Sequence, residues 1–169
     1  LRRWERRPEQ MGSLNLSLSQ EIELLEKGAD QLGIGLTSRQ LSLMGQYLAL
    51  LIKWNKAYNL TSVRDPKGMV TRHLLDSLTV APYMKGARIL DVGSGPGLPG
   101  VPLSILHPDK CYILLDSNGK KTRFLKEVKM QLNLDNVLIV KERVERFQDE
   151  TGFDSIICRA YSSAPDFFL

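Results

Sequence analysis

The chain has 169 residues, of which 43% are apolar, with 23 Lys and Arg, 19 Asp and Glu, and two cysteines. This composition is typical of one soluble globular domain and excludes a disordered or fibrous protein. The two cysteines form neither a disulfide framework nor a metal-ligand cluster, and no apolar run approaches the roughly 18 residues of a membrane span. We therefore expect a reduced, cytoplasmic protein without a metal site.

The formal net charge of +4 suggests an acidic partner such as RNA. However, four arginines and two glutamates place +2 of that charge in residues 1–10. We expect residues 1–16 to be a disordered N-terminal extension outside the fold. Net charge is therefore weak evidence for a nucleic-acid partner.

The first half of the chain is predicted to be a helical cap over residues 17–86. Apolar residues recur there at three- and four-residue steps, which indicates amphipathic helices. Ser17 or Ser19 is a candidate N-cap for the first helix, and Asp65 followed by Pro66 is one for the third. The predicted helices run from about 17 to 33, from about 38 to 56 and from about 66 to 81.

The second half, residues 87–169, alternates short apolar runs with helical stretches. The runs at 88–92, 111–115, 137–140 and 155–158 are typical of buried parallel strands, and helices are expected at about 100–106 and 119–132. Such alternation predicts right-handed crossovers and a doubly wound sheet. The predicted fold class is thus α/β, a Rossmann-like sheet with an N-terminal helical cap.

A glycine-rich turn follows the first predicted strand. Gly93, Gly95 and Gly97 allow the backbone to approach a ligand closely, and a helix begins just beyond them. The spacing Gly95-x-Gly97-x-x-Gly100 also fits the dinucleotide fingerprint. The pattern alone therefore leaves NAD, FAD and S-adenosylmethionine open.

Two acidic residues help to choose among these cofactors. Asp91, at the end of the first strand, is expected to point toward the ligand crevice or its edge, where it would repel a pyrophosphate but not the cationic S-adenosylmethionine. Asp116 ends the second strand, where a carboxylate can accept hydrogen bonds from ribose hydroxyls. Two alternatives remain open: Asp91 caps the loop amides, or Asp116 is the N-cap of the next helix.

The chain resembles the bacterial rRNA guanine-N7 methyltransferases, also called glucose-inhibited division protein B. The similarity extends over about residues 36–164, and several of its motifs are specific to that family. The blocks that carry it are residues 53–62, 72–77, 91–100, 102–104, 115–117, 143–145 and 158–160.

The resemblance implies S-adenosylmethionine as the cofactor and N7 of a guanine in 16S rRNA, or in a ribosomal subunit precursor, as the methyl acceptor. Because N7 carries a lone pair and no proton, the reaction requires no general base. Gly93 and Leu98 match the family's cofactor loop, Val144 and Glu145 match its adenine site, and Arg159 matches an arginine at the cofactor.

RNA contacts are expected from polar and basic residues around the crevice mouth. The solvated face of an ordinary helix is the alternative for the lysines, and a buried hydrogen-bonded position between cap and sheet is the alternative for His73. The candidates are Asn59, Arg64, Arg72, His73, Lys120 and Arg123, followed by Lys121, Lys126 and Arg159.

Other functions are compatible with parts of the sequence. A methyltransferase for a protein or small molecule and a dinucleotide-dependent oxidoreductase share the predicted sheet. Since only four of the seven strands of a methyltransferase sheet are found before Leu169, a truncated, non-catalytic fragment is a further hypothesis. A full-length version is expected to act as a monomer.

Overall fold

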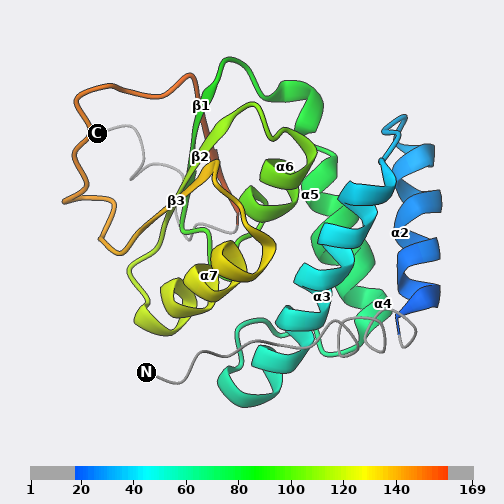
Figure 1. The fold of residues 1–169 in the computed structure, drawn as a ribbon. Coiled ribbons are helices and arrows are strands. Elements are labelled where there is room, and N and C mark those ends of the chain that lie inside the picture. Colours follow the sequence, from blue (N-terminus) through cyan, green and yellow to red (C-terminus); the bar gives the residue numbers. More distant parts are fainter. Residues whose placement is uncertain (1–17, 160–169) are drawn as a thin grey trace.

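The computed structural model of the chain describes residues 18–159. A group of helices lies against a four-stranded sheet (Figure 1). Every helix of the described residues is too short or too polar to cross a lipid bilayer. The helices that precede the sheet are α2 (Ser19–Gln31), α3 (Ser38–Tyr58), α4 (Pro66–Met69), the π-helical η1 (Val70–Leu75), α5 (Asp76–Leu78) and the 3₁₀ turn η2 (Ala81–Tyr83).

Two of the predicted helix starts are confirmed by their caps. Thr37 and Gln40 form a capping box at the start of α3, and the Asp65 carboxylate accepts the Gly68 N–H at 2.6 Å at the start of α4. The serine cap predicted for α2 is wrong. Ser19 is already helical and Leu18 occupies the N-cap position without a side-chain hydrogen bond, while Ser17 lies outside the described residues.

The third helix is continuous from Pro66 through Leu78 and contains the π-helical stretch η1. It ends three residues before the predicted Ala81. Pro82 explains the early end, because it lacks the N–H that would bond to the Leu78 carbonyl in a continued α-helix. The chain turns instead through η2 and enters the sheet.

All four predicted strands and both helices between them are confirmed. The strands are β1 (Arg88–Val92), β2 (Cys111–Leu115), β3 (Val137–Val140) and β4 (Ser155–Cys158), with α6 (Gly100–Leu106) and α7 (Gly119–Leu132). The strands are parallel, in the order β3-β2-β1-β4. Their carboxyl ends therefore lie at one edge of the sheet, where ligands bind in open α/β folds.

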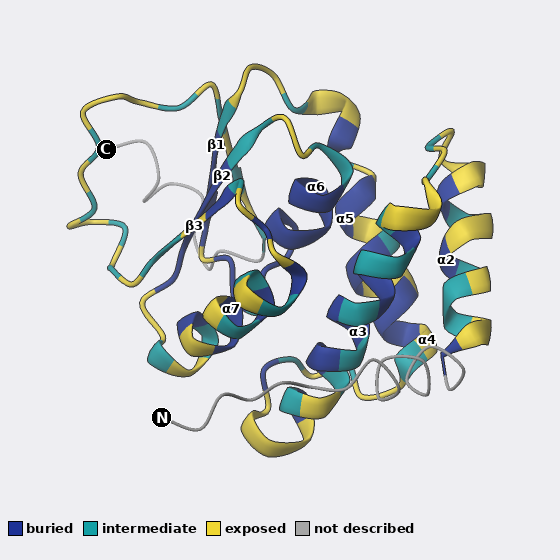
Figure 2. Cartoon of the chain, in the orientation of Figure 1, coloured by how far each residue is buried: buried dark blue, intermediate teal, exposed yellow. Residues whose placement is uncertain are grey.

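The two faces of the sheet are covered differently. Helices α6 and α7 pack on one face, and α3 packs against these two helices. The main core contains Tyr47, Tyr112 and Phe124 as its largest fully buried side chains. The other face is covered, within residues 18–159, by the segment 141–154. Figure 2 shows this segment as mostly exposed or intermediate, whereas α6 is almost entirely buried.

Candidate functional site

The glycine loop between β1 and α6 is joined to the end of β2. The N–H groups of Gly93 and Ser94 both donate to the Leu115 carbonyl, at 2.8 and 3.1 Å. Gly93, Gly95 and Gly97 have φ values of 66°, 58° and 99°, in the left-handed region that favours glycine. The loop therefore has a fixed path over the carboxyl edge of the sheet.

The glycines of this loop serve two different purposes. A Cβ at Gly97 would lie 2.5 Å from Val101 Cγ2, and one at Gly100 would lie 2.6 Å from Asp91 Oδ2, so both positions allow close packing. A Cβ at Gly95 would meet nothing closer than 3.9 Å, where the Gly93 carbonyl and Lys121 Nζ lie. Gly95 is thus the position where a ligand can approach the backbone.

Asp91 lies beneath the loop. Its side chain is 0% exposed, its Oδ2 accepts the Gly100 N–H at 2.9 Å, and its Oδ1 has no hydrogen-bond partner among the described residues. Burial raises the pKa of Asp91 to about 8. This corrects the expectation that Asp91 faces an open crevice, and the alternative that it caps a loop amide is confirmed.

Asp116 connects the second strand to both neighbouring segments. Its Oδ2 accepts the Gly95 N–H at 2.8 Å and its Oδ1 accepts the Asn118 N–H at 2.7 Å. The N-cap of α7 is Asn118, whose side chain accepts from the N–H groups of Lys120 and Lys121, so the N-cap alternative for Asp116 is wrong. Asp116 thereby lies next to the backbone of Gly95.

Tyr47 of α3 is a site residue that the sequence analysis missed. Its hydroxyl donates to the Pro96 carbonyl at 2.9 Å and its side chain is fully buried. Burial also raises the pKa of this phenol. The sequence offers one signal, a tyrosine on an apolar helix face, since a buried hydroxyl needs a partner.

Arg159 follows β4 and bonds to residues of η1 and α5. Its Nη2 donates to the Arg72 carbonyl at 2.5 Å and lies 3.4 Å from Asp76 Oδ2. Its Nη1 is buried without a hydrogen-bond partner among the described residues. These contacts hold the guanidinium beside the helix that contains Arg72 and Asp76, at the carboxyl edge of the sheet.

The remaining cofactor candidates have contrasting environments. Leu98 is 5% exposed and belongs to the main core, so its backbone, more than its side chain, is available to a ligand. Val144 is half-buried against the second face of the sheet, and Glu145 is exposed. Both belong to the segment that follows β3.

His73 is not an exposed RNA contact. It is 6% exposed, its Nε2 lies 2.8 Å from Thr61 Oγ1, and burial lowers its pKa. Burial and a hydrogen bond, as in the alternative for His73, are therefore confirmed, and the partner Thr61 belongs to the helical cap. Asn59 and Arg64 are both exposed and bonded to each other, since Arg64 Nη2 donates to Asn59 Oδ1 at 2.7 Å.

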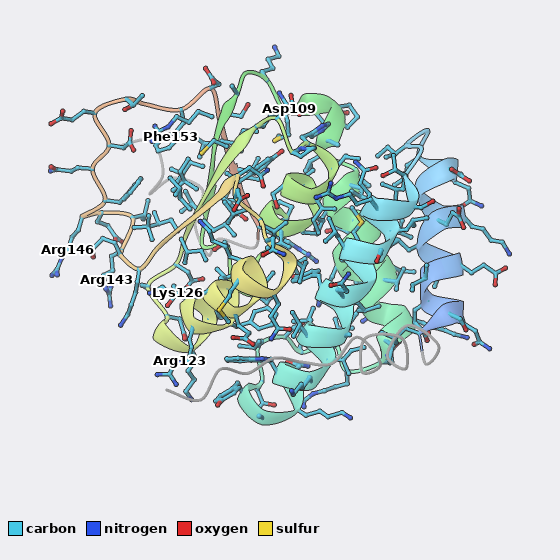
Figure 3. All side chains as sticks on the ribbon, viewed as in Figure 1. Asp109, Arg123, Lys126, Arg143, Arg146 and Phe153 are labelled. Carbon is cyan, nitrogen blue, oxygen red and sulfur yellow. The ribbon has the colours of Figure 1, made fainter. Side chains whose placement is uncertain are left out.

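Lys120 and Arg123 line a hollow of about 740 Å³, which we name the basic hollow. Figure 3 shows Arg123 and Lys126 on α7 near the segment that follows β3. Within residues 18–159 no group of three His, Cys, Asp or Glu side chains could hold a metal ion. The residues of the basic hollow are Asn118, Gly119, Lys120, Thr122, Arg123, Lys126 and Lys141.

Comparison with known proteins gives consistent matches. The family model GidB, described as rRNA small subunit methyltransferase G, matches residues 40–168. Ribosomal RNA small subunit methyltransferase G of Stutzerimonas stutzeri (strain A1501) is 58% identical over 156 residues, covering 91% of this chain and 73% of the relative. The proteins of the same name from Pseudomonas entomophila (strain L48) and Pseudomonas aeruginosa (strain UCBPP-PA14) are 58% and 60% identical, covering 90% and 85% of this chain and 72% and 67% of those relatives.

Proposed function

The chain belongs to the rRNA small subunit methyltransferase G family, and on that premise we propose that it transfers a methyl group from S-adenosylmethionine to N7 of a guanine in 16S rRNA. The observation that carries the proposal is the open backbone at Gly95, beside the Asp116 carboxylate, at the carboxyl edge of the parallel sheet. This is the edge at which α/β folds of this type bind nucleotide-like ligands.

The residues at this edge fit the proposed cofactor. The left-handed Gly95 leaves room for a ligand to approach its backbone. The Asp116 oxygens, each with one backbone donor, retain lone pairs that can accept ribose hydroxyls. Val144 and Glu145 are proposed for the adenine, and Arg159, Gly93 and Leu98 for the rest of the molecule.

The chemistry requires positioning more than proton transfer. Bound S-adenosylmethionine supplies an electrophilic methyl group on a sulfonium. Guanine N7 attacks with its own lone pair, so no side chain has to remove a proton from it. The chain's contribution is to hold the two reactants in line, an effect of up to about 7–11 kcal/mol on the barrier. Tyr47, Asp91 and Asp116 act by fixing the glycine loop that determines this geometry.

The proposal also covers the division of the chain into cap and core, the location of the protein in the cell and its substrate. Residues 17–86 form a helical cap that supports the glycine loop through Tyr47, and residues 87–169 form the methyltransferase core. Residues 1–16, predicted to be an extension outside the fold, lie outside the described residues. We propose a cytoplasmic enzyme that acts as a monomer and without a metal ion, with 16S rRNA or a ribosomal subunit precursor as its substrate.

The test is methyl transfer from labelled S-adenosylmethionine to small-subunit rRNA from cells that lack the modification. We expect label at a guanine that becomes sensitive to cleavage after borohydride reduction, as N7-methylguanine is. Label on protein, or on another RNA position, would contradict the proposed acceptor. Failure to bind S-adenosylhomocysteine by calorimetry would contradict the cofactor site itself.

A matched pair of glycine variants tests the Gly95 site. Gly95 and Gly152 both have positive φ, 58° and 75°, and open space around the missing Cβ. Gly95→Val and Gly152→Val both place a β-branched residue at a positive φ, but only the first blocks the proposed cofactor site. S-adenosylhomocysteine binding should be lost in Gly95→Val and kept in Gly152→Val; equal losses would refute the assignment.

A further inference from the structure

We propose that the basic hollow on α7 binds the sugar-phosphate backbone of the RNA substrate beside the target guanine. This inference rests on the proposed function and adds to it a second RNA-binding surface, distinct from the cofactor loop. Three of its cations, Lys120, Arg123 and Lys126, come from α7, and Lys141 comes from the residue after β3. Among the residues that the structure describes, the lining contains four cations and no acidic side chain.

The three α7 cations form a line. They are spaced three residues apart, so they lie on neighbouring turns of one helix face. With a rise of 1.5 Å per residue, Lys120 and Lys126 are separated by about 9 Å along the axis. A line of charge of this length is suited to successive phosphates of a nucleic-acid strand, and it is longer than a single phosphate group.

Within residues 18–159 these cations have no acidic ion-pair partner. Among residues 18–159, the ion pairs involve other basic groups, Lys27 with Glu23, Arg88 with Asp149 and Arg159 with Asp76. By contrast, Lys129 on the same helix donates to the Val137 carbonyl at 2.5 Å and so has a structural role. Lys120, Arg123 and Lys126 are all exposed, and their charges are therefore available to an external anion.

The hollow also lies close to the glycine loop. Helix α7 begins three residues after Asp116, and Lys121 Nζ lies 3.9 Å from the position of a Cβ at Gly95. A strand held along Lys120, Arg123 and Lys126 would therefore pass beside the proposed cofactor. Asn118 and Thr122 add hydrogen-bonding groups to the same lining. Backbone contacts of this kind position an RNA without reading its sequence.

The test compares two double variants that remove the same charge. Arg123→Gln with Lys126→Gln alters the hollow. The control, Arg39→Gln with Lys85→Gln, alters two exposed cations at the edge of the sheet opposite to its carboxyl edge. Lys85 lies there because its N–H bonds to Ser155 at the start of β4. Arg39 lies there because its neighbour Gln40 bonds to the Leu106 carbonyl at the end of α6. Binding of a fluorescein-labelled RNA hairpin is followed by anisotropy at several salt concentrations. Calorimetry with S-adenosylhomocysteine and thermal melting are run on the same proteins.

We expect the hollow variant to lose about 10-fold or more in RNA affinity near 0.1 M salt, with a salt slope reduced by about 1–2. The control should change affinity by less than about twofold, and both should bind S-adenosylhomocysteine like the parent chain. Equal losses in both variants, or an unchanged salt slope in the hollow variant, would overturn the inference while leaving the proposed function intact. Loss of S-adenosylhomocysteine binding in the hollow variant would assign these cations to the cofactor site instead. A parent chain that binds S-adenosylhomocysteine but no RNA would overturn both proposals.

Discussion

The two faces of the sheet are built from alternate residues of the same strands, yet they differ in what covers them. On the face that α6 and α7 cover lie Ile89, Asp91, Tyr112 and Leu114. On the other face, Leu138, Ile113, Leu90 and Ile156 form a row across all four strands in register. The two ends of that row, Leu138 and Ile156, are 48% and 54% exposed.

Most of the buried apolar residues lie on the helix-covered side of the sheet, and so do the groups that hold the glycine loop. Tyr47 bonds to Pro96 and Asp91 bonds to Gly100, both from the helix-covered side. The face covered by segment 141–154 contributes a small cluster of four buried residues, Leu90, Val92, Ile113 and Leu115. Substitutions on the helix-covered face should therefore affect stability and cofactor binding together.

The largest effect is expected at Phe124. This fully buried ring of α7 lies 6.3 Å from the ring of Tyr47 and 5.5 Å from that of Trp54, so Phe124→Ala leaves a cavity and should cost about 3–5 kcal/mol of unfolding free energy. Its counterpart Phe153 is half-buried on the other face, and Phe153→Ala should cost about 1–2 kcal/mol. Urea denaturation measures both. Similar losses would mean that the two faces contribute equally.

The next effect is a pH dependence from Asp91. Its pKa rises on folding from an ordinary 3.8 to about 8, so between these values the unfolded chain releases a proton that the native chain keeps. Stability should therefore fall as pH rises from about 4 to 8, by at most about 1.4 kcal/mol per pH unit.

Asp91→Asn keeps an acceptor for the Gly100 N–H and removes the titration. The unfolding free energy of the variant relative to the parent chain should increase steadily from pH 5 to pH 8. Taking this difference cancels the opposite contribution of His73, whose pKa burial lowers. A difference that does not change with pH would show that Asp91 is ionised in the folded protein.

A smaller loss is expected from Tyr47→Phe. Removing the hydroxyl leaves the Pro96 carbonyl without its tyrosine partner, at a cost of about 1–3 kcal/mol, and should weaken S-adenosylhomocysteine binding through the glycine loop. Tyr112→Phe is the matched control, since the Tyr112 hydroxyl is buried on the same face without a partner among the described residues. That variant should be neutral or stabilising. Calorimetric binding and thermal melting of the two variants decide between these outcomes.

The smallest effect is expected at the ends of the exposed row. Ile156→Thr and Leu138→Thr keep a side chain of moderate size on a half-exposed position and should change the unfolding free energy by about 0.5 kcal/mol or less. Urea denaturation measures the unfolding free energy of both variants. A loss above about 1 kcal/mol would show that this face is covered in solution, which would remove the contrast between the two sides.

The strands and α7 could be predicted to the residue, because short apolar runs are separated by glycine, proline and asparagine that end elements locally. The environments of Asp91 and His73 could not be predicted from the sequence. The hydrophobic period of a segment does not tell whether one of its polar residues is covered by another element. Asp91 bonds to Gly100 at the start of α6, 9 residues on, and His73 lies against Thr61, 12 residues earlier. The Tyr47–Pro96 hydrogen bond could not be predicted either, because its two residues are 49 positions apart and no local sequence pattern connects them.

The Asp116 side chain joins two backbone segments at the carboxyl edge of the sheet. One carboxylate accepts N–H groups from the glycine loop and from the entrance of α7, so the two segments share a single anchor. Any ligand that takes up the remaining lone pairs of that carboxylate would restrict both at once. Amide hydrogen exchange at Gly95 and Asn118 should therefore slow in parallel as S-adenosylhomocysteine is added.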